Sequence, residues 1–461
     1  MDVDYLIKGG HVVTVDKERR VFRNGAIAVR QDLIVDVGRT EELEKRFVPS
    51  KTIDARNKVV VPGLINTHAH VSAEQAFRGL VPDDVDHLDW AFKWIVPMYS
   101  GLSAEEEYAT ALFTFIEMIK NGTTAFCEAG TAKHVDQIVA AMNAVGIRGC
   151  VGKWTWDIPK TPANLYQTTD EACETTEEVI KKYHNSANGR IKVWATPIGH
   201  TQTSDQLLVG LKQLAEKYDT GMTMHLSSWL EDVHGYVERT GKRPVQYYED
   251  LGILGRNLLL VHMVNVDDSE IDLLQEHDVK IAHCPSTAFW FGYGISQVGK
   301  FPEMLERGIC VSVGTDAANC SNHFDMLRSL YLIAGVYKDA RRDMSVMPVE
   351  KVVEMGTIEG ARAILQEDRL GSLEAGKKAD IVILDARRSE WLPLFNVLNN
   401  LVYSADGHSV DTVMIDGQVV MEDRKITLVD ELQVCEQIQK VGERALKRIG
   451  LPVRTRWRVI D

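Results

Sequence analysis

The chain has 461 residues, of which 45% are hydrophobic, and its formal net charge is −14 at pH 7. This length and core-forming content fit two or three average domains, or one large barrel with a smaller partner. The acidic balance argues against nucleic acid and anionic membranes as partners, since both bind basic surfaces, and no run approaches the roughly 20 apolar residues of a membrane-spanning helix.

Seven cysteines are scattered without Cys-X-X-Cys spacing, which is typical of reduced thiols. The first residues, Met1–Lys8, are strand-like and show neither a basic n-region nor a cleavage site. We therefore expect a cytoplasmic protein.

Short apolar or alternating segments separated by turn residues occupy both ends of the chain. The N-terminal segments are Tyr5–Ile7, Val12–Val15, Ala26–Val29 and Leu33–Val37, and the C-terminal ones are Ile381–Leu384, Val410–Ile415 and Val419–Met421. Asp416-Gly417 between the last two predicts a hairpin. We expect one small β-sandwich built from both termini, covering residues 1–58 and 368–461.

Between these ends, strand and helix patterns alternate. Ser103 and Glu106 form a capping box before the helical stretch Tyr108–Lys120, and Asn121-Gly122 ends it. The strand candidates number eight: Leu64–His68, Thr123–Cys127, Gly149–Lys153, Lys192–Thr196, Gly221–His225, Leu258–His262, Val279–His283 and Ile309–Gly314. Eight strands with intervening helices predict an α/β fold with a (β/α)8 barrel over residues 59–367.

The ends of these strands carry the chemistry. Residues two apart on a strand point the same way, so His68 and His70 leave the first strand side by side. Further polar residues end other strands: Glu128, Lys153, His225, His262, His283 and Asp316. In a barrel these ends meet at one face, where active sites lie.

Such a set suits one divalent metal held by nitrogens and a carboxylate. We assign His68, His70, His225 and Asp316 as ligands and Asp316 also as general base. His262 is the candidate to polarise the substrate or to protonate the leaving group. Zinc is the first expectation, with iron, cobalt and manganese open, because three histidines and one aspartate accept several divalent ions.

The chain resembles the amidohydrolase superfamily, and within it the branch of cytosine deaminases, adenosylhomocysteine-type deaminases and triazine hydrolases. The resemblance rests on these segments: Pro62–His70, Arg78–Leu80, Met118–Thr124, Met224–Leu226, Ala282–Pro285, Gly314–Ala317, Thr357–Arg362 and Gly371–Val382. It implies a metal-bearing barrel with a composite β-sandwich. It also implies a homo-oligomer, as in relatives.

Two departures bear on the reaction. Family deaminases carry a proton-shuttling Glu three residues after the fifth-strand His, whereas Ser228 follows His225 at this spacing here. A hydroxyl cannot relay protons at neutral pH as a carboxylate does. Two-metal relatives carry a carboxylated lysine on the fourth strand, but Lys192 stands at the wrong end of that strand, so we expect one metal.

Aromatic residues from several loops predict a mostly apolar pocket. Trp90 and Trp94 lie in a lid segment spanning Asp83–Met98, and Trp156, Trp290 and Phe291 come from loops at the same end. Packing onto the barrel rim explains at least half of these aromatics equally well. The expected pocket residues are Trp90, Trp94, Glu128, Lys153, Trp156, Ser228, His283, Trp290 and Phe291. Lys153 could instead pair with Glu128, and His283 could equally be a structural, hydrogen-bonded residue.

These features favour a metal-dependent hydrolase of a small, mostly apolar molecule. The first expectation is cleavage of an amide, urea or (thio)carbamate bond, including xenobiotics such as phenylureas, by a metal-activated hydroxide. The alternative is removal of an amine or chloride from a nitrogen heterocycle. A metal-free scaffold is a third possibility, against which the presence of all four predicted ligands argues.

Overall fold

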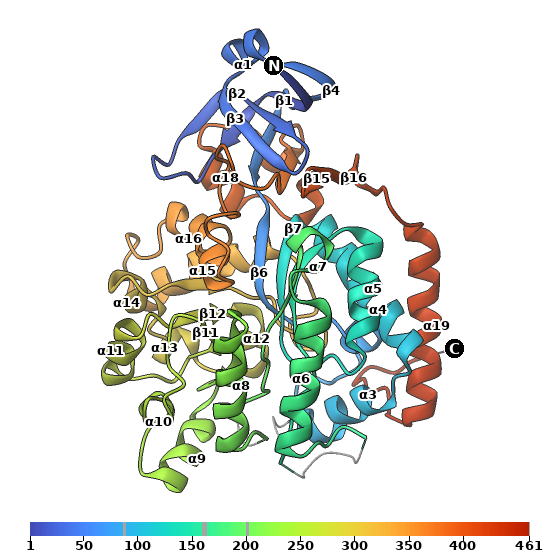
Figure 1. The fold of residues 1–461 in the computed structure, drawn as a ribbon, viewed down its shortest axis with the longest axis vertical. Coiled ribbons are helices and arrows are strands. Elements are labelled where there is room, and N and C mark those ends of the chain that lie inside the picture. Colours follow the sequence, from blue (N-terminus) through green and yellow to red (C-terminus); the bar gives the residue numbers. More distant parts are fainter. Residues whose placement is uncertain (86–88, 159–163, 200–201, 461) are drawn as a thin grey trace.

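A computed structural model describes residues 1–85, 89–158, 164–199 and 202–460, in which helices and strands alternate (Figure 1). Strands from both chain ends form a sheet at the top of Figure 1, and a larger body with helices on its outside lies below it. Strand β6 runs from the sheet region into this body. The predicted α/β class is confirmed.

The upper sheet has nine strands, drawn from both termini. They are β1 (Asp2–Val13), β2 (Val21–Arg30), β3 (Leu33–Arg39), β4 (Val48–Asp54), β5 (Lys58–Pro62), β14 (Ile381–Asp385), β15 (Val410–Ile415), β16 (Gln418–Glu422) and β17 (Lys425–Ile426). Their order is β17-β16-β15-β14-β5-β1-β2-β3, with β4 also paired to β1. The two ends of the chain meet where β5 and β14 pair antiparallel.

The Asp416-Gly417 hairpin is confirmed between β15 and β16. Both turn residues have positive φ, +53° at Asp416 and +77° at Gly417. This is the backbone that a two-residue type I′ turn requires, and Gly adopts it without a steric penalty. The turn chemistry therefore sets the register of this edge of the sheet.

The body contains the eight predicted parallel strands in two sheets of four. One sheet is β6 (Leu64–Ala69), β7 (Thr123–Glu128), β8 (Arg148–Val151) and β9 (Ile191–Val193), and the other is β10 (Met222–Leu226), β11 (Leu258–His262), β12 (Lys280–His283) and β13 (Val311–Val313). Isolated parallel bridges join the sheets, Ala69 to Asp316 at one seam and Ala195 to Met222 and Gly199 to His225 at the other. Because β9 and β13 have only three residues each, the pairing at the seams stays short.

Helices surround these strands. They are η1 (Glu74–Phe77), the π-helical turn η2 (Trp90–Ile95), α3 (Val96–Gly101), α4 (Ala104–Lys120), α5 (Val135–Val145), α6 (Thr169–Tyr183), α7 (Ser186–Gly189), α8 (Asp205–Lys217), α9 (Leu230–Thr240), α10 (Pro244–Asp250), α11 (Asp268–Glu276), α12 (Pro285–Phe291), α13 (Ile295–Val298), α14 (Phe301–Glu306), α15 (Met326–Arg341), α16 (Val349–Met355) and α17 (Ile358–Ala363). The capping box before α4 is confirmed in both directions, since the N–H of Glu106 donates to the Ser103 hydroxyl and Glu106 Oε2 accepts from the N–H of Ser103. Short helices beside the upper sheet are α1 (Thr40–Arg46), η3 (Ser389–Trp391), α18 (Val397–Tyr403) and η4 (Gly407–Ser409).

The last helix, α19 (Glu431–Ile449), leaves the upper sheet and runs along the body (Figure 1). It packs against α4, η1 and α3, which belong to the segment that we assigned to the barrel. A Cβ at Gly442 would lie 2.5 Å from the carbonyl oxygen of Ala76, so this glycine lets the helix approach η1 closely. Within the ranges that the structure covers, no helix combines the length and apolar content needed to cross a membrane.

Candidate metal centre

The predicted ligands come together where the parallel strands end. His68 lies within β6, His70 follows that strand directly, and His225 lies in β10. Asp316 comes three residues after β13 and pairs with β6 through the bridge to Ala69. All four side chains are buried. One strand end of the first sheet (β6) and two of the other (β10 and β13) thus meet at one point.

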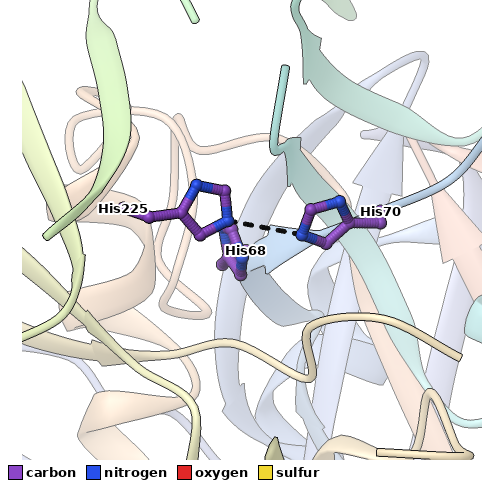
Figure 2. A group of neighbouring side chains, drawn as sticks. All are labelled: His68, His70 and His225. Carbon is purple, nitrogen blue, oxygen red and sulfur yellow. Dashed lines mark hydrogen bonds between the residues drawn. The ribbon is translucent and has the colours of Figure 1, made fainter. Parts of the chain in front are cut away.

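The spacing of their atoms is that of a coordination shell. The Nε2 atoms of His225 and His70 lie 3.4 Å apart (Figure 2). Asp316 Oδ1 lies 3.4 Å from His68 Nε2 and 3.2 Å from His70 Nε2. Ligand atoms at the vertices of a tetrahedron around zinc, with metal–nitrogen bonds of about 2.0–2.1 Å, are about 3.3 Å apart. The three histidines therefore form a group suited to one divalent ion, and Asp316 Oδ1 lies at the same spacing from His68 and His70.

The outer ring nitrogens of two histidines make the bonds expected of metal ligands. His225 Nδ1 donates to the carbonyl oxygen of Ile198 at 2.7 Å. His70 Nδ1 lies 3.3 Å from Thr131 Oγ1, whose own hydroxyl donates to Glu128 at 2.7 Å. In both rings the proton is thereby held on Nδ1, and the lone pair of Nε2 faces the centre. Among the described residues, the buried His68 Nε2 has no hydrogen-bond partner, which leaves this nitrogen available as a metal ligand.

The electrostatics of the centre favour a positive charge. Burial by itself would lower the pKa of His70, but the charges of Glu74, Asp316 and Glu128 raise it to about 9. Burial raises the pKa of Glu74 to about 7. Although burial opposes its charge, Asp316 has a pKa well below its ordinary value, because His68 and His70 surround it. Buried carboxylates are stable as anions only beside a cation, and a divalent ion supplies one.

Two residues of the centre have strained backbones. His262 and Asp316 adopt φ values of +73° and +64°, a region that non-glycine residues rarely occupy. Such strain costs of order 1–3 kcal/mol per residue and is found mainly at functional sites. It turns the side chains toward each other, so that His262 Nε2 lies 3.7 Å from Asp316 Oδ2.

Comparison with known proteins places the chain in a family. The pattern of the amidohydrolase family matches residues 59–420. The chain is 33% identical to a 5-methylthioadenosine/S-adenosylhomocysteine deaminase of Syntrophobacter fumaroxidans, over 95% of this chain and 98% of that protein. The chain belongs to the amidohydrolase family.

Other relatives agree with this membership. A 5'-deoxyadenosine deaminase of Methanosarcina acetivorans is 31% identical, over 96% of this amidohydrolase and 99% of that protein. An adenosine deaminase from Xanthomonas campestris with bound zinc has a TM-score of 0.90 at 26% identity, covering 97% of this chain and 99% of that one. An atrazine chlorohydrolase from Arthrobacter aurescens, complexed with zinc, shares the fold with a TM-score of 0.88 at 22% identity, covering 95% and 100%. The amidohydrolase thus acts as a hydrolase on carbon–nitrogen bonds, and it carries a site suited to a divalent metal.

Several of the predicted pocket aromatics contact one another. Trp90 meets Phe291 edge-on with ring centroids 5.0 Å apart, and Trp290 contacts the same ring at 4.6 Å. Trp94 belongs to a buried cluster with Trp156 and its stacked neighbour Trp154. Residues 86–88 of the predicted lid lie outside the described residues. Ser228 is buried, and its hydroxyl has no hydrogen-bond partner among the residues described.

The contacts of three further predicted pocket residues differ from one another. The carboxylate of Glu128 accepts bonds from the N–H groups of Gly130 and Thr131 and from the Thr131 hydroxyl, so it holds its own loop. His283 stacks on Phe301 at 3.8 Å and bonds Tyr337, facing helices α14 and α15 and not the pocket. Lys153 has no carboxylate within 4.0 Å in the described ranges, so the expected pair with Glu128 is absent; burial lowers the pKa of Lys153 to about 8.

The sequence interpretation missed other residues at the centre. Tyr293 lies edge-on to His262 with centroids 5.7 Å apart and stacks on Phe291. Glu74 lies 3.7 Å from His70 and accepts a hydrogen bond from Tyr99. No local sequence pattern points to this contact, because His70 follows a strand and Glu74 begins the next turn.

Proposed function

We propose that this amidohydrolase is a zinc-dependent enzyme that removes an amine or a halide from a nitrogen heterocycle by hydrolysis, with the two four-stranded sheets acting as one (β/α)8 barrel. The observation that carries the proposal is the spacing of the ligand atoms, which lie 3.2–3.4 Å from their neighbours around one centre. The relatives that are 31% and 33% identical are named as deaminases of adenosine-type molecules. They favour a heterocycle over the amide, urea or (thio)carbamate that we expected first.

His68, His70, His225 and Asp316 would hold the ion, which when bound supplies a Lewis acid that makes water a stronger nucleophile at neutral pH. Asp316 accepts the proton of the attacking water, because its Oδ2 faces away from the ligand nitrogens toward His262. His262 stabilises the charge that develops on the substrate's ring nitrogen. The indole and phenyl rings of Trp90, Trp290 and Phe291, which contact one another, exclude water from the substrate pocket in this proposal.

One observation favours a second candidate, cleavage of an amide, urea or (thio)carbamate. The Ser228 hydroxyl stands where family deaminases carry the carboxylate that protonates ammonia. A serine cannot hold that proton at neutral pH. A leaving group that needs little protonation, such as an aniline or a thiolate, would suit this site better.

The deciding experiment is product analysis on zinc-loaded enzyme. The panel pairs 5'-deoxyadenosine, methylthioadenosine, aminopyrimidines and chlorotriazines with N-aryl ureas, anilides and thiocarbamates, and a His225→Ala variant serves as the metal-deficient control. We expect ammonia or chloride release that the control lacks. Release of an amine, aniline or thiol from the ureas, anilides or thiocarbamates, with no turnover of the heterocycles, overturns the proposal and establishes the second candidate.

A substitution at Ser228 tests the proton-transfer argument. We expect Ser228→Glu to raise the rate of ammonia release about tenfold or more over the isosteric, uncharged Ser228→Gln, because only the former can carry the proton. Equal rates in the two variants would show that proton transfer does not depend on this position.

A further inference from the structure

His70 has two faces with different neighbours. Its Nε2 faces the other predicted ligands, 3.2 Å from Asp316 and 3.4 Å from His225. Its Nδ1 faces away from them, toward Thr131 Oγ1 at 3.3 Å and Glu74 Oε1 at 3.7 Å. Whatever accepts the Nδ1 proton fixes both the tautomer and the plane of this ring.

Glu74 is placed as a buried anion beside this nitrogen. Its side chain has no exposed surface, and Oε1, the oxygen nearest to His70, also accepts the hydroxyl proton of Tyr99 at 2.6 Å. Oε2 is buried without a hydrogen-bond partner. Among the ion pairs of the described residues Glu74 pairs with His70 and with no lysine or arginine. Within this part of the chain its positive neighbour is therefore the ligand histidine, together with whatever that histidine binds.

The chain fixes the position of this carboxylate from two sides. Glu74 begins the short turn η1 directly after the strand end that carries His70, and α19 packs closely on this turn at Gly442. Tyr99 belongs to α3 and is itself buried against Trp154, with ring centroids 5.3 Å apart. Burial, together with the charge of Glu74, raises the pKa of Tyr99 well above 10, so its hydroxyl stays protonated and donates.

Thr131 provides the hydrogen-bond acceptor of Nδ1, and it is a neutral one. Because its hydroxyl proton goes to Glu128, its oxygen can only accept from His70. This bond requires the proton on Nδ1, whereas Glu74, 3.7 Å away, acts on the ring through charge. A carboxylate at this position makes the imidazole a stronger metal ligand, and loss of such partners typically costs 10–100-fold in metal affinity.

We propose that Glu74, held by Tyr99, is the positioning residue of His70: it fixes the ring and strengthens its bond to the metal. This rests on the metal centre of the proposed function and adds to it a residue outside the ligand set. Glu74 does not contact the substrate in this proposal. Its effect passes through His70.

The test measures metal affinity in the absence of substrate. Zinc dissociation constants of the wild type, Glu74→Gln, Tyr99→Phe and Thr131→Val are measured by chelator competition, with the absorption spectrum of the cobalt-substituted forms and the melting temperature of the apo forms recorded beside them. We expect Glu74→Gln to raise the dissociation constant about tenfold or more and to shift the cobalt bands. Tyr99→Phe should give a smaller rise in the same direction.

The matched comparison is between Glu74, the charged neighbour of His70 Nδ1, and Thr131, the neutral one. Thr131→Val removes the nearer acceptor without changing charge, and we expect a rise in the dissociation constant smaller than that of Glu74→Gln. A dissociation constant within twofold of the wild type for Glu74→Gln, with unchanged cobalt bands, overturns the proposal. A fall in the apo melting temperature alone also overturns it, because that is a structural effect. If Glu74→Gln does not fold, Tyr99→Phe decides by the same two readouts.

Failure of the underlying function is distinguishable. The metal centre itself is refuted if the wild type binds no stoichiometric zinc. It is also refuted if the wild type and His225→Ala bind zinc equally well. A wild type that binds zinc but turns over none of the heterocycles refutes only the proposed reaction, and the affinity comparison at Glu74 remains decisive.

Discussion

Two buried charge clusters stand at opposite ends of the parallel strands, and they differ in how their charges are compensated. At the start of β8, the fully buried Arg148 bonds Asp380 through two nitrogens at 2.9 and 3.1 Å and Asp416 at 2.9 Å. Lys378 adds a second cation, 3.2 Å from Asp416. At the other end, Asp316, Glu74 and Glu128 gather around histidines with no lysine or arginine paired to them in the described ranges.

The difference separates a structural cluster from a ligand site. In the Arg148 cluster the acidic and basic side chains pair with one another. The cluster joins β8 to the sheet built from the chain ends, and its charges need no bound ion for compensation. In the histidine cluster the carboxylates are paired only with histidines in the described ranges, so a bound cation would stabilise them further. Burial marks both clusters, whereas pairing with histidine in place of lysine or arginine marks only the second.

The largest expected effect is at the carboxylate of the metal centre. We expect Asp316→Asn to lower kcat/KM by 10²–10⁴-fold, because the amide cannot accept the proton of the attacking water. Asp380→Asn in the other cluster is the matched control and should keep the kcat/KM of the folded enzyme. Measurements are made at equal, verified metal content. Full activity of metal-loaded Asp316→Asn would refute its role as general base.

The second expected effect is a loss of folding stability that leaves the metal centre intact, whereas the first is a loss of activity. Arg148→Met leaves Asp380 and Asp416 buried with less compensation and should lower the free energy of unfolding by about 3–5 kcal/mol in denaturant titrations. The exposed pair Arg56 with Asp54 provides the control, since Arg56→Met should leave the free energy of unfolding essentially unchanged. Equal effects of the two substitutions would mean that the Arg148 cluster does not brace the fold.

Much of the fold and of the predicted ligand set could be predicted from the sequence, because these features depend on local sequence patterns. The eight strands follow from apolar runs, and His68, His70, His225 and Asp316 follow from their place at strand ends. The capping box of Ser103 and the hairpin at Asp416-Gly417 depend only on neighbouring residues. These features need no knowledge of how distant segments pack.

The sequence left questions open, and missed contacts, where packing decides the outcome. Alternate residues of a strand face opposite sides, and His283 at the end of β12 takes the helix side, against Phe301 and Tyr337. Glu128 turns back onto its own loop. The Tyr99–Glu74 contact joins α3 to η1 through a tertiary arrangement for which no sequence pattern exists. Tyr293 reaches His262 only because the chain after α12 folds back over the centre.

Metal removal should also distinguish the histidine cluster from the Arg148 cluster, because only the histidine cluster is expected to bind metal. With zinc at 10²–10³ times its dissociation constant, binding adds about 3–4 kcal/mol to the free energy of unfolding. We expect a chelator to remove this increment in the wild type, measured as a shift of the denaturation curve. His225→Ala should show no increment, whereas Arg148→Met should keep it despite its lower stability. An increment that survives in His225→Ala would place the bound metal elsewhere.

The smallest expected effect concerns a histidine that belongs to neither cluster. Burial lowers the pKa of His283 to about 3, against 6.5 for the ordinary side chain. Between these values the unfolded chain binds a proton that the folded chain refuses, so stability is intact above pH 6.5 and falls as the pH drops below it. At pH 5 the loss amounts to about 2 kcal/mol.

His283→Gln removes the titrating group while keeping an acceptor for the Tyr337 hydroxyl. We expect the wild type to lose about 2 kcal/mol more than this variant between pH 7 and pH 5, measured by denaturant titration of the chelator-treated proteins so that the metal ligands contribute equally. Tyr337→Phe keeps the buried ring and should keep the wild-type slope. Identical slopes in the wild type and His283→Gln would show that the ring takes up its proton in the folded state, and its packing against Phe301 would then not exclude charge.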